Sequence, residues 1–86
     1  MWKIVLSSKA KKQTKTAIKS VYRNNIEELM KIIAINPFQN PPPYEKLEPS
    51  VDNSYSRRIN KQHRLSYRVC ESEKTVVILS LWTHYE

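Results

Sequence analysis

The chain has 86 residues and a formal net charge of +7, from 15 Lys and Arg against 8 Asp and Glu. At this length we expect one domain, residues 1–86, with a single small core. The chain contains no glycine and one cysteine, which excludes the Gly-rich loops that hold phosphates and any internal disulfide, and fits a reducing cytoplasm.

The positive charge is concentrated in two blocks. Residues 1–26 carry six Lys and one Arg, residues 53–70 carry four Arg and one Lys, and neither block contains an acidic residue. Such blocks favour a polyanionic partner, most simply nucleic acid, although a basic surface that only aids solubility has the same composition. No apolar run approaches the roughly 20 residues of a membrane span and no signal peptide is recognisable, so we expect a soluble cytoplasmic protein without membrane contact.

The beginning of the chain predicts a strand and then a helix. In residues 2–6, WKIVL, apolar residues alternate as in a sheet, and the two following serines are candidates to cap a helix over residues 9–21. One face of that helix is apolar but thin, with Ala10, Thr14, Ala17, Ile18 and Val21. The other face either follows a phosphate backbone or is simply solvated, and it carries Lys9, Lys12, Lys15 and Lys19.

A second helix is predicted from a cap at Ser20 to about residue 35, where Asn36–Pro37 ends it. Its apolar stripe has the spacing of a core face and comprises Tyr22, Ile26, Leu29, Met30 and Ile33. Residues 37–50 contain all five prolines and predict an extended, stiff connector. We expect this connector to be pinned to the body of the protein by Phe38, Tyr44 and Leu47.

The last third predicts three strands. Residues 54–60, 64–69 and 75–82 either alternate or are apolar throughout, and short turns join them. The order β-α-α-β-β-β gives an α+β fold, with a mostly antiparallel four-stranded sheet and both helices packed on one face. The other face of the sheet is then open, and the pleat places on it Arg64, Ser66 and Arg68.

Several side chains expected near that face have the properties needed for RNA cleavage without a metal. The reaction needs a base for the 2′-OH, an acid for the leaving 5′-oxygen and fixed positive charge for the phosphorane. The candidates are the connector residue Glu45, the C-terminal His84 and Tyr85, and the arginine pair Arg57 and Arg58. No metal or other cofactor is predicted, since the chain has two histidines, one aspartate and no HxH or CxxC pair. A plain nucleic-acid-binding module would carry the same basic residues.

Longer motifs add a resemblance to a family. The segments "NPF", "PPPYEKL", "YSRRINKQHRLSYRV" and "WTHYE" together resemble the Txe/YoeB branch of the RelE-like toxins of bacterial toxin–antitoxin modules. The resemblance covers nearly the whole chain and implies a RelE-like fold. It also implies a ribosome-dependent mRNA endonuclease, which cuts the codon in the ribosomal A site, stops translation, and leaves a 2′,3′-cyclic phosphate and a 5′-OH.

The resemblance implies roles for single residues as well. Glu45 matches the loop glutamate that acts as general base, and Arg64 matches the arginine that stabilises the scissile phosphate. His84 matches the general acid, and Tyr85 a residue that orients the substrate. Arg57 and Arg58 match an arginine pair of the family, of which one is expected to support the phosphate while a structural role stays open for the other. Contacts with the RNA backbone are thus assigned to Lys46, Arg57, Arg58 and Arg68 and, from the charge pattern of the first helix, to Lys9, Lys12, Lys15 and Lys19. The sequence departs from the family pattern in having Glu48 where a lysine is common and in continuing to Glu86 after the tyrosine.

The implied partners are the ribosome with its mRNA and a labile cognate antitoxin of the YefM/Phd-like type, whose acidic segment would fold onto the basic face. Operator DNA is expected to bind only through the antitoxin complex, and both a monomer and a homodimer stay open. Two other functions also stay open. A non-catalytic nucleic-acid- or ribosome-binding module would not need Glu45 or His84. A gyrase-targeting toxin on the same fold is not expected to combine the "HRL" arginine with the "HY" terminus.

Overall fold

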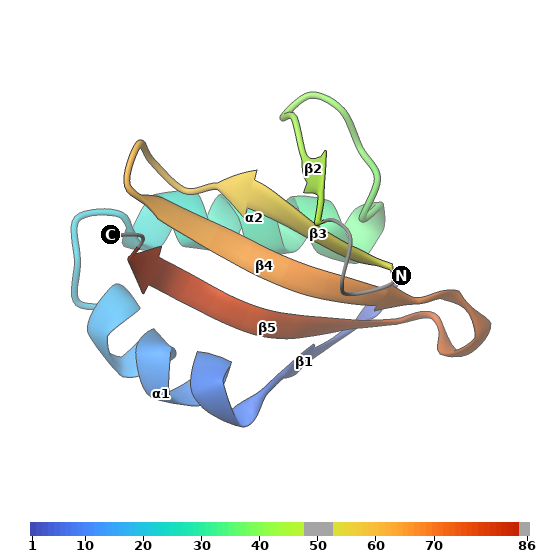
Figure 1. Ribbon diagram of the computed structural model, residues 1–86, viewed down its shortest axis with the longest axis horizontal. Coiled ribbons are helices and arrows are strands. Elements are labelled where there is room, and N and C mark those ends of the chain that lie inside the picture. The colour runs from blue at the N-terminus through green and yellow to red at the C-terminus, as the bar shows by residue number, and fades with distance from the viewer. Residues whose placement is uncertain (48–52, 85–86) are drawn as a thin grey trace.

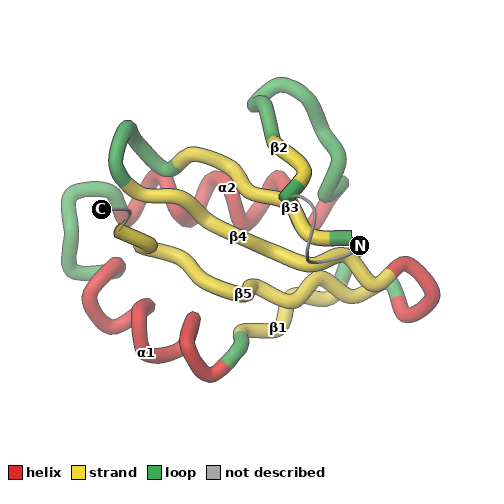
Figure 2. The backbone as a smooth tube through the Cα atoms, viewed as in Figure 1, coloured by secondary structure: helices red, strands yellow, loops and turns green. Residues whose placement is uncertain are grey.

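A computed structural model describes residues 1–47 and 53–84, with side chains given through residue 81 at the C-terminal end. Its elements are β1 (Lys3–Leu6), α1 (Ser8–Ala17), α2 (Arg23–Ile35), β2 (Glu45–Lys46), β3 (Ser54–Arg58), β4 (His63–Cys70), the 3-10 helix η1 (Glu71–Glu73) and β5 (Thr75–His84). The strands form one sheet in the order β1-β5-β4-β3-β2 (Figures 1 and 2), with β1 parallel to β5 and the other pairs antiparallel. The predicted α+β class is confirmed. None of the described helices is long and apolar enough to cross a membrane.

The sheet of the described residues has five strands, where the sequence predicts four, because Glu45 and Lys46 form a short edge strand. Glu45 lies opposite Ser56 on β3, and Lys46 lies opposite Tyr55. The prolines at 41–43 have no backbone N–H, so regular pairing with β3 begins only after them. Two residues are too few to show hydrophobic alternation, which explains why the sequence predicts only a connector here.

The first helix lies beside the part of β5 that β1 does not reach. β1 ends at Leu6, whereas β5 continues beyond the point where they pair. Ser7 then caps α1 by accepting from an N–H of its first turn (3.1 Å), and its hydroxyl donates to the Leu79 carbonyl oxygen (2.8 Å). Further along α1, the Gln13 Oε1 accepts from the Leu81 N–H (2.8 Å). These bonds fix α1 along the outer edge of β5, as Figure 1 shows.

A turn between the helices makes both of them shorter than predicted. α1 ends at Ala17, and α2 begins at Arg23 without a side-chain cap. Ser20, the predicted cap of the second helix, donates its hydroxyl to the Ala17 carbonyl oxygen (2.7 Å) and so closes the first helix. Val21, predicted on the apolar face of the first helix, is 86 % exposed in this turn. The Ser20 Oγ also accepts from the Tyr22 N–H (3.1 Å), so the hydroxyl has partners on both sides of the turn, and the sequence pattern does not show which helix end it serves.

Both helices and the sheet share one hydrophobic core, with α2 behind the sheet in the view of Figure 1. The predicted stripe of α2 is confirmed for its buried members Ile26, Leu29 and Ile33. The other buried core residues are Ala10, Ala17, Ile59, Leu65, Tyr67, Val69, Val76, Ile78 and Leu81. Because Leu65, Tyr67 and Val69 alternate with Arg64, Ser66 and Arg68 along β4, the latter three lie on the opposite side of the sheet, which we call the open face.

Candidate active site

The structure brings Glu45 and Arg64 into direct contact on the open face. The Arg64 Nη1 on β4 lies 2.7 Å from the Glu45 Oε1 on β2. β3 lies between these two strands, with Ser56 opposite Glu45 and Arg58 opposite Arg64. The three-stranded ladder therefore aligns two side chains that are 19 residues apart in the sequence. Both are side chains to which the family resemblance gives a role in catalysis.

A hollow of about 280 Å³ opens beside this pair, lined by Pro43, Glu45, Ser56, Arg58 and Arg64. The side chain of Arg64 is 26 % exposed and that of Glu45 is 66 % exposed, so solvent reaches both. The pairing of β4 with β5 slips twice close to Arg64, and such irregularities redirect side chains and are frequent beside active sites. The hollow therefore presents two guanidinium groups and one carboxylate to a ligand. In the described part of the chain, no three His, Cys, Asp or Glu residues gather as metal ligands.

The neighbouring arginines change the acidity of Glu45. The hydrogen bond from Arg64, and then the charge of Arg64, hold the pKa of the Glu45 carboxyl below its ordinary value, and Arg58 adds a smaller effect in the same direction. Glu45 is therefore ionised at neutral pH and able to accept a proton. While Arg64 is paired with it, Glu45 is nevertheless a weaker base than a free carboxylate. An anion that drew Arg64 away would raise the pKa of Glu45.

The structure corrects the prediction that Arg57 contacts RNA. Its side chain is 1 % exposed and donates hydrogen bonds to the carbonyl oxygens of Pro37 (3.0 Å), Gln39 (2.9 Å) and Pro42 (2.6 Å). From this position the guanidinium group cannot reach a ligand on the open face. The sequence could have predicted this orientation from strand alternation. Arg57 lies two residues before the buried Ile59, so both side chains point to the same side of the sheet.

The other basic residues near the pair are exposed. Arg58 lines the hollow, whereas Lys46, which follows Glu45 on β2 and lies opposite Tyr55, points to the other side of the sheet by strand alternation. Arg68 lies on the same face as Arg64, four residues further along β4. These positions leave all three side chains accessible to a bound nucleic acid, and their predicted contacts with RNA stay predictions.

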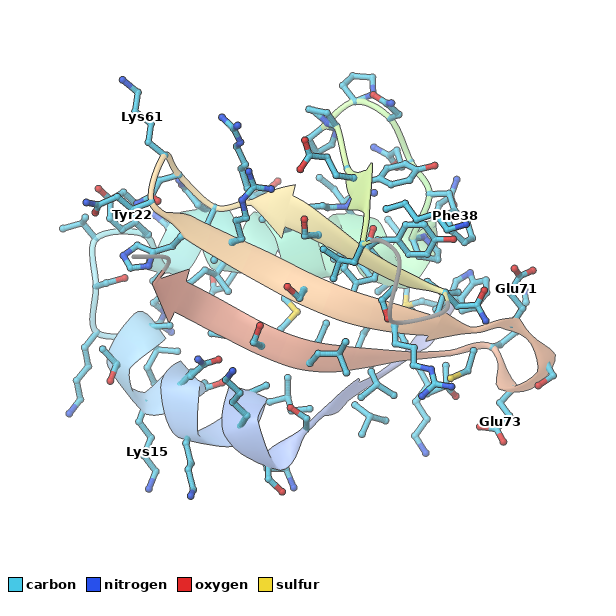
Figure 3. All side chains as sticks on the ribbon, viewed as in Figure 1. Lys15, Tyr22, Phe38, Lys61, Glu71 and Glu73 are labelled. Carbon is cyan, nitrogen blue, oxygen red and sulfur yellow. The ribbon has the colours of Figure 1, made fainter. Side chains whose placement is uncertain are left out.

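The lysines of α1 are not brought near the hollow. α1 packs against β5 and β1, and β2, which carries Glu45, lies at the other end of the strand order. The four lysines assigned to RNA contacts are exposed, and Figure 3 shows Lys15 pointing away from the sheet. They belong to a separate basic surface, which we call the α1 lysine face and which consists of Lys9, Lys12 and Lys15 on α1 and Lys19 in the turn after it.

The C-terminal candidates are only partly described. The backbone of β5 continues beside β4 to its end, where Thr83 pairs with Arg64 and His84 pairs with His63. The last strand thus ends alongside the strand that carries Arg64. The side chain of His84 and the whole of Tyr85 lie outside the described residues, so their catalytic roles stay predictions.

Comparison with known proteins identifies the family. The family model of the YoeB-like toxins of bacterial type II toxin–antitoxin systems matches residues 10–85. The chain belongs to the YoeB toxin family. The resemblance drawn from the sequence motifs is thereby confirmed. Among its relatives is Toxin YoeB of Synechocystis sp., which is 36 % identical over 61 residues, covering 71 % of this chain and 69 % of that protein.

Solved structures of YoeB proteins share the fold described above. The YoeB–YefM complex from Staphylococcus aureus contains a chain that is 32 % identical, with a TM-score of 0.81 and 99 % of both chains covered. The YoeB dimer from Staphylococcus aureus gives 31 % identity, a TM-score of 0.79 and 98 % of both chains covered. The predicted RelE-like architecture is therefore confirmed for this YoeB-family protein, including the sheet on which Glu45 and Arg64 meet.

Proposed function

We propose that this protein is a ribosome-dependent mRNA endonuclease, which cleaves mRNA in the ribosomal A site without a metal ion and thereby inhibits translation. The observation that carries the proposal is the contact between the Glu45 carboxylate and the Arg64 guanidinium, 2.7 Å apart beside a hollow of the open face. A carboxylate and an arginine at one exposed position supply a base and a phosphate-binding group, and membership of a toxin family gives these groups a target.

In the proposed reaction Glu45 accepts the proton of the ribose 2′-OH, and the freed oxygen attacks the adjacent phosphorus. Arg64, assisted by Arg58, stabilises the negative charge of the phosphorane, because a guanidinium fork binds two oxygens and stays protonated. His84 donates a proton to the leaving 5′-oxygen, and Tyr85 orients the substrate. One proton is taken up and one is released, and the products are a 2′,3′-cyclic phosphate and a 5′-OH.

The ion pair gives this reaction an order of events. Arg64 cannot hold a phosphate with the same N–H groups that it donates to Glu45. Binding of the scissile phosphate therefore exchanges one anionic partner of Arg64 for another, and the released Glu45 becomes a stronger base next to the 2′-OH. The catalytic carboxylate is thus activated only when a phosphate occupies the hollow.

The proposed partners are the ribosome with its mRNA and a cognate antitoxin of the YefM/Phd-like type. The YoeB–YefM complex and the YoeB dimer from Staphylococcus aureus support an antitoxin partner and a homodimer for this chain. An acidic antitoxin segment would neutralise the basic residues of the open face, and operator DNA would be bound through the antitoxin complex. We therefore also propose a cytoplasmic location, where ribosomes and their mRNA are found.

The proposal is tested with purified protein and ribosomes programmed with a defined mRNA, by mapping the new 5′ ends. Cleavage within the A-site codon is expected with ribosomes, and little cleavage is expected of the free message. An inert nucleic-acid-binding module would bind the ribosome and leave the message whole. Growth arrest with an intact message would refute the nuclease and favour a protein target such as gyrase.

A further inference from the structure

Arg57 is a buried cation that binds one segment of the chain at several points. Beyond the carbonyl oxygens of Pro37, Gln39 and Pro42, its Nε donates to the Tyr67 hydroxyl (3.2 Å). The Tyr67 hydroxyl in turn donates to the same Pro37 carbonyl oxygen (2.8 Å). The guanidinium group of β3 and the phenol of β4 thus hold the backbone of residues 37–42, a segment without regular secondary structure.

Aromatic rings enclose this arrangement. The Arg57 guanidinium lies over the rings of Tyr44 (5.1 Å to the centroid) and Tyr67 (5.9 Å). Tyr55 packs edge-on against Tyr44 at 5.6 Å and against Phe38 at 5.3 Å. The connector is therefore pinned at Phe38 and Tyr44, as the sequence predicts for these two residues. The rings also keep water away from the hydrogen bonds of Arg57, which strengthens them.

Burying an arginine in this way lowers the stability of the fold. Removing a cation from water costs several kcal/mol, and no carboxylate in the described part of the chain pairs with Arg57 to offset this. An apolar side chain of similar volume would fill the same space at a lower cost. The arginine does what an apolar side chain cannot do: its planar fork fixes several carbonyl oxygens in one geometry.

The segment that Arg57 holds leads directly into Glu45. Tyr44, whose ring lies against the guanidinium, is the preceding residue, and β2 itself is only two residues long. So short a strand cannot set its own position, and the connector must supply part of it. We propose that Arg57 is a positioning residue, which places the Glu45 carboxylate opposite Arg64 by fixing the backbone of residues 37–44. This inference rests on the proposed function for its catalytic part, and its structural part stands independently.

The test compares Arg57→Lys and Tyr67→Phe with Arg23→Lys, a matched change at an exposed arginine of α2. Lysine keeps the charge and loses the fork, while phenylalanine keeps the ring and removes only the hydroxyl. The first readout is the rate of single-turnover mRNA cleavage at saturating ribosome–mRNA complex, together with the concentration for half-saturation. The second readout is the rate of hydrogen exchange of the Leu47 amide, measured in the free protein. This amide directly follows β2 and donates to the Ser54 carbonyl oxygen, so it reports whether β2 stays paired with β3.

For Arg57→Lys we expect the saturated rate per folded molecule to fall by about tenfold to 10²-fold, with half-saturation unchanged within about twofold, since misplacing a catalytic group impairs the chemical step. Exchange of the Leu47 amide should accelerate by at least about tenfold relative to wild type and to Arg23→Lys. Tyr67→Phe should show the same pattern more weakly and serves alone if Arg57→Lys does not fold. Wild-type exchange at Leu47 would overturn the proposal, and so would a wild-type saturated rate. If the wild-type protein cleaves nothing, the proposed function fails, and the exchange measurement still decides whether Arg57 holds β2.

Discussion

The Nη1 of Arg64 lies 2.7 Å from the Oε1 of Glu45, so the proposed phosphate-binding group and the proposed base neutralise each other when no substrate is bound. The pair is exposed enough for a ligand to separate it. A charged pair near the surface has a small net stability, because water and salt screen it. The phosphate of a bound message can therefore compete for Arg64 at little cost. In the proposed reaction, the free protein thus keeps Glu45 and Arg64 paired, and substrate binding has to separate them.

Three of the residues assigned to the reaction should each matter to the chemical step. Glu45→Gln, Arg64→Ala and His84→Ala are expected to slow single-turnover cleavage on the ribosome by at least about 10²-fold, which is what acid–base and electrostatic groups typically supply. Glu73→Gln alters an exposed glutamate of η1 and should cleave at the wild-type rate. Near wild-type rates in all three site variants would rule out this assignment of roles.

The ion pair should also appear in the pH dependence of stability. Since Arg64 lowers the pKa of Glu45 in the folded protein, the pair stabilises the fold above the ordinary pKa of the carboxyl. That contribution disappears as the pH falls through the lowered folded pKa. Urea unfolding of wild type and Glu45→Gln at several pH values tests this. The wild type should be slightly more stable near neutral pH, and the difference should vanish in acid; a difference that persists in acid would contradict the pairing.

Tyr67 should make the fold sensitive to alkali. Burial raises the pKa of its phenol, and the charge and hydrogen bond of Arg57 oppose this only in part. The raised pKa means that stability is complete below the unfolded pKa of tyrosine, about 10, and falls as the pH rises above it. Tyr67→Phe should lose less stability over that range than wild type does in urea unfolding. An equal alkaline loss in both proteins would show that Tyr67 is not responsible for it.

The hydroxyl of Ser7 should stabilise the fold by joining α1 to β5. Ser7→Ala removes the cap of α1 and the bond to the Leu79 carbonyl oxygen, at an expected cost of about 1–2 kcal/mol in the free energy of unfolding. Ser8→Ala changes the neighbouring exposed serine, the first residue of the helix, and should change stability by less than about 0.5 kcal/mol. Equal effects of the two substitutions would show that the capping geometry does not matter.

The α1 lysine face is expected to affect ribosome binding and to leave the chemical step unchanged. α1 packs against β5 and β1, whereas Glu45 lies on β2 at the opposite edge of the sheet. Combining Lys12→Gln with Lys15→Gln should weaken ribosome binding and reduce its salt dependence by about one unit of the logarithmic slope for each lost phosphate contact. The saturated cleavage rate should stay at the wild-type value. Lys31→Gln, on α2, is the control. An unchanged salt slope in the double variant would mean that these lysines are merely solvated.

Much of the fold follows from periodicity in the sequence. The buried residues Ile26, Leu29 and Ile33 have helical spacing, and Leu65 and Val69 have strand spacing. What periodicity does not determine is where one hydroxyl donates and where a strand of two residues begins. Ser20 has local partners on both sides, the Ala17 carbonyl oxygen and the Tyr22 N–H, so its residue type does not tell which helix end it serves. The strand Glu45–Lys46 depends on pairing with β3, which local patterns do not reveal.

The candidate site, too, is only partly predictable from the sequence. The residue types of Glu45 and Arg64 suggest their chemistry, but only the intervening strand β3 brings them within hydrogen-bonding distance. Arg57 and Arg58 are adjacent and chemically identical, and they differ in their surroundings because strand alternation places one in the core and the other at the hollow. A charge pattern alone treats the two as equal, whereas alternation counted from Ile59 distinguishes them.

The parallel pairing of β1 with β5 has a consequence for how the protein is made. Lys3 lies beside Thr75 and Leu6 beside Ile78, so the first strand to be synthesised has its partner near the end of the chain. Long-range pairing of this kind is slow to form and cannot precede the synthesis of both strands. The sheet of the nascent chain therefore stays unfinished until β5 has emerged from the ribosome that makes it. β5 lies between β1 and β4 in the strand order, so its arrival joins the first strand to the rest of the sheet.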